Sequence, residues 1–265
     1  MSDTIDPARS GIDAAAQPAM SAASARRAEP SETITVQLPA ADYVALAQGF
    51  YFVFWGLLVT LLAGAQLLIM VGIPAYSEWF LGAGVVSTLV GSRRLYQVRH
   101  AGGRWHSRAR VVFGLAILLA YFCVFFYLWR RVPDSMYLMG NALAFAASGI
   151  LYLVAFNRAV AALALALGRR TMALESQLLS ASNIGLLLLP FVCAVAYIII
   201  MAVFHKTEPL AELQSLLGHA NLLVIVVVLL PFSLTLSLAW SCKDVVLQEL
   251  AAIDRSANPT SSVHD

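Results

Sequence analysis

The residues most often used for chemistry inside a membrane, the ionisable ones, are missing from the centres of the long apolar stretches of this sequence. Of its 265 residues, 60% are hydrophobic and 12% are charged, whereas about 25% are charged in an ordinary soluble domain. The sequence contains no phosphate-binding loop, nucleophile elbow or zinc-protease motif, and its three cysteines lack metal-ligand spacing. We therefore predict no catalytic residue, no metal site and no cofactor, and a protein that is not an enzyme.

Two prolines lie inside apolar stretches in matching contexts. Pro190 and Pro231 each stand in the tetrapeptide Leu-Leu-Pro-Phe. Proline removes a backbone hydrogen bond and bends a helix. Two interpretations stay open: a hinge layer that gates a pathway, or two static kinks that shape a helical bundle. The static kinks are the favoured interpretation, because proline is common in membrane helices.

A second group of candidates is polar but uncharged. Asn141 and Asn221 both fall near the predicted external side of their apolar stretches. If they face one another, they line a polar cavity. Ordinary hydrogen bonding between helices is the alternative, and the favoured one.

Small residues recur at four-residue spacing in one stretch, where Ala83, Ser87 and Gly91 share a helical face and Gly84 and Thr88 lie on the adjoining row. Such residues let two helix backbones approach closely. We expect helix packing there, either within one chain or between two copies.

The segment Ser92–Arg110 carries six arginines and no acidic residue: Arg93, Arg94, Arg99, Arg104, Arg108 and Arg110. As a basic cytoplasmic loop it fixes the orientation of the chain, and this role alone is the favoured interpretation. Contact with anionic lipid headgroups is the second, and an acidic protein partner is the third. We expect no nucleic-acid binding.

Six stretches have the length and composition of membrane spans, which need about 20 mainly apolar residues. They are residues 49–73, 79–91, 111–129, 137–156, 183–204 and 220–240. The second is short and reaches spanning length only from about Pro74, with Arg93 and Arg94 snorkelling. The predicted fold is an all-α polytopic bundle of six transmembrane helices.

Positive charge sets the orientation. If the Ser92–Arg110 segment is cytoplasmic and successive spans cross the membrane in alternating directions, 14 of the 17 Lys and Arg residues lie inside. Arg130, Arg131 and Lys206 then lie outside. The positive-inside rule favours this arrangement. Both termini are then cytoplasmic. Residues 1–40 form a disordered tail, 41–241 the six-helix domain, and 242–265 a tail with a short amphipathic helix. The acidic residues of the first segment argue against a transit peptide, so we expect a bacterial inner (plasma) membrane.

Two functions remain. The favoured one is a non-catalytic scaffold or interaction subunit, in contact with the lipid bilayer and with a protein partner or a second copy of the chain. The alternative is a small transporter or channel with a hinge at Pro190 and Pro231.

Overall fold

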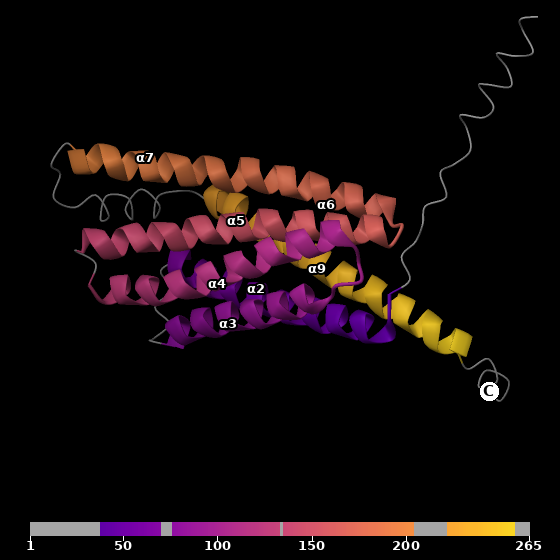
Figure 1. The fold of residues 1–265 in the computed structure, drawn as a ribbon. Coiled ribbons are helices and arrows are strands. Elements are labelled where there is room, and N and C mark those ends of the chain that lie inside the picture. Colours follow the sequence, from indigo (N-terminus) through magenta and orange to yellow (C-terminus); the bar gives the residue numbers. More distant parts are fainter. Residues whose placement is uncertain (1–37, 70–75, 133–134, 204–221, 258–265) are drawn as a thin grey trace, which may run out of the picture. The chain divides into compact units, whose positions relative to one another are not determined.

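A computed structural model describes residues 38–69, 76–132, 135–203 and 222–257, and all secondary structure in these ranges is helical (Figure 1). The all-α prediction is confirmed. The elements are α2 (Ala40–Ile69), α3 (Tyr76–Gln97), α4 (Gly103–Arg131), α5 (Met136–Ala166), α6 (Arg170–Asn183), the π-helical segment η3 (Ile184–Leu188), α7 (Leu189–Val203) and α9 (Leu222–Ala257). The segments α6, η3 and α7 follow one another without a break. Residues 1–37, which make up most of the predicted N-terminal tail, lie outside these ranges. Asn221, one of the two residues of the predicted cavity, also lies outside them.

A glycine in the left-handed region makes the turn between α5 and α6. Gly168 has φ 74°, which residues with a Cβ rarely adopt. The amide of Arg169 donates to the carbonyl of Ala164 at 2.8 Å, and that of Gly168 to Leu165 at 3.2 Å. These two bonds form a Schellman motif, which satisfies the last carbonyls of a helix. The chain therefore reverses sharply and α6 packs against α5.

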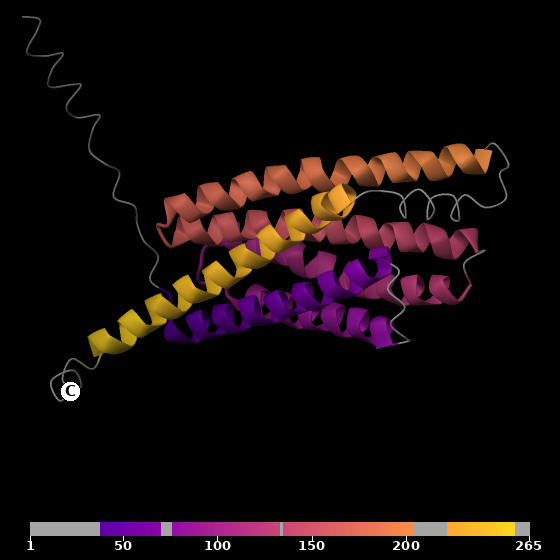
Figure 2. The ribbon, with the colours of Figure 1, turned by 180° about the vertical axis from the view of Figure 1, so that it is seen from behind.

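The helices surround a common centre. Helix α2 packs against α3 and α9, α4 packs against α3 and α5, and α6 contacts both α5 and α9. Helix α9 crosses the others obliquely (Figure 2). Each of these helices therefore has a neighbour on two sides.

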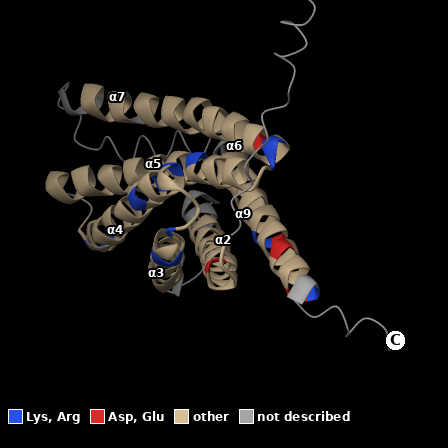
Figure 3. Ribbon diagram, turned by 45° about the vertical axis from the view of Figure 1, so that its right-hand side comes forward, with Lys and Arg blue, Asp and Glu red and all other residues tan. Residues whose placement is uncertain are grey.

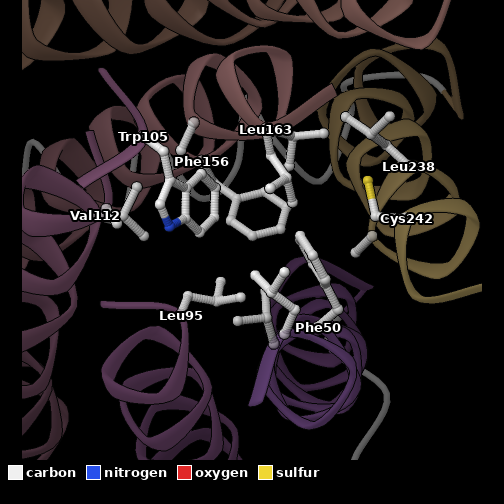
Figure 4. Close-up of a cluster of buried hydrophobic side chains, with 14 of the residues drawn as sticks. Phe50, Leu95, Trp105, Val112, Phe156, Leu163, Leu238 and Cys242 are labelled. Atoms are coloured by element: carbon white, nitrogen blue, oxygen red, sulfur yellow. The ribbon is translucent and has the colours of Figure 1, made fainter. Parts of the chain in front are cut away.

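An apolar cluster fills this centre at the end where α3 is joined to α4 (Figure 4). Phe50 of α2 meets Phe156 of α5 edge to face, with ring centroids 6.1 Å apart. Every residue of α5 from Ala159 to Ala164 is buried, so α5 is covered on all sides there. Four of these six residues are alanines, which let the neighbouring helices come close.

Among the residues described, four helical stretches are long and apolar enough to cross a membrane: Ala40–Ala63, Gly103–Arg131, Met136–Ala166 and Arg170–Ile200. The chain is thus a multi-pass helical membrane protein. Helices α3 and α9 are not among the four, so six spans are not confirmed.

Candidate functional site

Helices α2 and α3 touch backbone to backbone along a line of glycines, which we call the glycine seam: Gly49 and Gly56 of α2 with Gly84 and Gly91 of α3. A methyl group added to Gly91 would lie 2.7 Å from the carbonyl oxygen of Gly49, and one added to Gly84 would lie 2.9 Å from that of Gly56. No side chain fits between these backbones. Ser87 strengthens the seam by donating a hydrogen bond to the Phe52 carbonyl at 2.8 Å.

The residues that the sequence singled out for helix packing lie on the α3 side of this seam. Of the five residues expected to pack helices, Gly84 and Gly91 face α2, Ser87 bonds to α2 and Thr88 is buried. Ala83 is exposed, and its role in packing stays a prediction. The α2 side escaped notice because Gly49 and Gly56 are seven residues apart in a stretch of bulky apolar residues, outside the four-residue pattern.

The six arginines gather where α3 ends and α4 begins, and all six are exposed (Figure 3). The expected basic loop is wrong in its conformation: Arg93 and Arg94 belong to α3, and Arg104, Arg108 and Arg110 belong to α4. Only residues 98–102 connect the two helices. Trp105, which is buried and donates to the Val98 carbonyl at 3.1 Å, closes this short connection.

We call the region of α3 and α4 between Arg93 and Arg110 the arginine-rich end. Two polar contacts join it to the other helices. The Arg108 guanidinium donates to the carbonyl of Arg158 in α5 at 2.6 Å. His100 Nδ1 lies 2.7 Å from a carboxylate oxygen of Asp42 in the first turn of α2. Among the described residues none of the six arginines pairs with an acidic side chain, so their positive charge stays available to a partner.

Both prolines of the Leu-Leu-Pro-Phe tetrapeptides lie within long helical segments. Pro190 follows the π-helical segment η3 by two residues. It has no amide hydrogen, so the carbonyl of Leu186 loses its α-helical donor, and the wider π turn accommodates this defect. Pro231 is buried inside α9.

A polar cluster lies beside these two irregularities. The Thr235 hydroxyl of α9 accepts hydrogen bonds from the amide groups of Asn183 at 3.0 Å and Asn157 at 3.3 Å. It donates to the Pro231 carbonyl at 2.9 Å. All three side chains are completely buried, at 0% exposure. We call Asn157, Asn183 and Thr235 the Thr235 cluster. It ties α5, the end of α6 and α9 together.

None of these three residues was predicted to belong to a site. They share one signal in the sequence, a position near the predicted cytoplasmic end of a span, and this signal does not show that they meet. The expected cavity pair stays untested. The Asn141 amide donates to the Tyr137 carbonyl within its own helix at 2.8 Å, and Asn221 lies outside the described residues.

The chemistry available at the Thr235 cluster is hydrogen bonding by neutral groups. It contains no nucleophile paired with a base and no charged side chain. Within the described ranges, no three His, Cys, Asp or Glu residues lie close enough to hold a metal ion. Comparison with family models, curated proteins and solved structures found no match.

The glycine seam can be tested by adding one methyl group at a glycine inside the seam and, as a control, one at a glycine outside it. In Gly56→Ala the new Cβ would lie 2.6 Å from the Thr88 amide nitrogen and 2.7 Å from the Gly84 carbonyl oxygen, so the two helices must separate. We expect the free energy of unfolding to fall by about 1–3 kcal/mol, measured by denaturant titration in detergent. Gly82→Ala is the matched control, since nothing lies within 4 Å of its new methyl group. Equal losses in the two variants would contradict the seam.

Proposed function

We propose that the chain is a membrane scaffold or interaction subunit with six spans and both termini in the cytoplasm, and that its arginine-rich end holds anionic lipid headgroups. One observation carries the proposal: six exposed arginines, which have no acidic partner among the described residues, lie at the end of a tightly packed apolar core. In a membrane protein, such a surface lies next to the lipid headgroups, which are therefore its nearest partner.

The length and hydrogen bonds of α3 support a second crossing. Its 22 residues extend about 33 Å at 1.5 Å per residue, which covers a hydrocarbon layer of about 30 Å. Its low hydropathy comes partly from Thr88 and Ser92, which donate to the carbonyls of Gly84 and Thr88 at 2.9 and 2.8 Å. Because these hydroxyls are satisfied, they cost less in lipid than a hydropathy scale assigns to them.

Helix α9 supports the last crossing and a cytoplasmic C-terminus. Its first 21 residues, up to Cys242, carry no charge, and charged residues begin at Lys243. Beyond this point Val246 is buried against the core, and Glu249 accepts a hydrogen bond from Arg169 at 2.9 Å. These contacts favour an α9 that crosses the membrane and continues along the end of the bundle where the arginines lie.

The packed core favours a scaffold over a pathway at this end. Phe50, Phe156 and Trp105 are each at most 1% exposed where the helices converge. Tyr152 fills the gap beside them, and its hydroxyl lies 3.0 Å from that of Ser92. A protein that works by presenting a surface needs such a rigid support.

Lipid contact is tested by the dependence of stability on anionic lipid. A basic residue near an anionic surface contributes about 1 kcal/mol, so adding phosphatidylglycerol to phosphatidylcholine nanodiscs is expected to raise the melting temperature. The triple variant Arg94→Gln/Arg99→Gln/Arg104→Gln is expected to lose most of this gain, while Arg130→Gln at the other end of α4 keeps it. An unchanged gain in the triple variant would count against lipid binding.

A transporter is the second candidate, because the Thr235 cluster joins two helical segments that each contain a proline, Pro190 after η3 and Pro231 inside α9. Solute flux into vesicles containing the purified protein separates the two functions. A transporter with a proline hinge gives flux that Pro190→Ala and Pro231→Ala reduce at least severalfold, whereas a scaffold gives no flux above that of empty vesicles.

A further inference from the structure

In the part of the chain that the structure describes, two oxygen atoms of the Thr235 cluster are buried without a hydrogen-bond partner, as are His106 Nδ1 and Trp129 Nε1 elsewhere. These two oxygen atoms are Asn157 Oδ1 and Asn183 Oδ1. Both side chains are at 0% exposure. A buried acceptor without a donor is costly, and lipid offers it no donor.

Thr235 cannot serve these oxygens. A hydroxyl has one proton and two lone pairs. Its proton goes to the Pro231 carbonyl, and its lone pairs accept from the two amide nitrogens. Among the described residues, the two amide oxygens are therefore left without a donor in this arrangement.

The missing donor has a defined chemistry. It must be small, because the three side chains are fully enclosed, and it must offer two hydrogens to two carbonyl-type oxygens. It must also be neutral, because the cluster contains no charged side chain. A monovalent cation needs a shell of several oxygens, whereas the cluster offers two unpartnered oxygens, Asn157 Oδ1 and Asn183 Oδ1. A water molecule satisfies all these conditions, since buried waters typically make about two to four hydrogen bonds.

We propose that Asn157 Oδ1 and Asn183 Oδ1 together bind one water molecule, which donates a hydrogen bond to each. Both amide groups already converge on the Thr235 hydroxyl, which brings the two carboxamides side by side. The water then links α5 to the helix formed by α6, η3 and α7, next to Pro231 of α9. This site is independent of the lipid contact proposed above and exists in a scaffold as well as in a transporter.

A double-mutant cycle isolates the shared water. Asn157→Leu, Asn183→Leu and the pair are made in the wild-type and Thr235→Val backgrounds, and their melting temperatures are measured in one detergent. Thr235→Val removes the hydroxyl that both asparagines contact, so coupling that persists in this background does not pass through Thr235 and is assigned to the water. We expect the pair to lose at least about 2 °C less than the sum of the single losses. Additive changes in the Thr235→Val background would overturn the proposal.

Two further measurements keep the test decisive if a variant fails to fold. The melting temperature of the wild-type protein is compared in sodium, potassium and choline chloride. Equal values support water, whereas a rise with sodium or potassium that Asn157→Leu abolishes would mean a cation site. An experimental density map of the wild-type protein is expected to show one peak within hydrogen-bond distance of both amide oxygens, and an apolar or protein-filled space there would refute the site.

Discussion

The hydrocarbon layer of a membrane offers no hydrogen-bond partner, so each polar group inside a span needs a partner in the chain or in an enclosed water molecule. Much of this structure follows from that constraint. Ser87 reaches across to the backbone of α2, and Ser92 lies against the Tyr152 hydroxyl of α5. The Thr235 hydroxyl satisfies two asparagines from two other helices. Each of these bonds joins two different helices, so satisfying the polar groups also helps to fix which helices are neighbours.

Close packing supplies the remaining cohesion, because apolar side chains gain little by leaving lipid for protein. The glycine seam brings the backbones of α2 and α3 together, and the alanines near the end of α5 allow it to be enclosed by its neighbours. Larger rings then fill the centre, where Phe50 meets Phe156. The arginines stay outside this packed region, at the helix ends. A rigid core with a charged end is suited to presenting a surface.

The helical class and the membrane environment were predictable, because they depend on local composition. Half of the seam was predictable too, since Gly84 and Gly91 share a face with Ser87. Its other half was missed because nothing in the α2 sequence indicates where Gly56 meets a partner. The Ser92–Arg110 segment was expected to be a loop because it is polar, yet a charged helix end has the same composition. The meeting of Asn157 with Thr235, 78 positions later, depends on the turn at Gly168 and the path of α9, which no local pattern encodes.

The orientation of α3 and α9 is the central claim, and cysteine labelling tests it most directly. Single cysteines at Ser77, Gly103, Val132 and Ala252, introduced into a chain whose native cysteines are replaced, are exposed to a membrane-impermeant maleimide in intact cells and in inverted vesicles. We expect labelling of Ser77→Cys and Val132→Cys from outside, and of Gly103→Cys and Ala252→Cys only in inverted vesicles. Labelling of Ser77→Cys and Gly103→Cys from the same side would show that α3 does not cross and would contradict the six-span bundle.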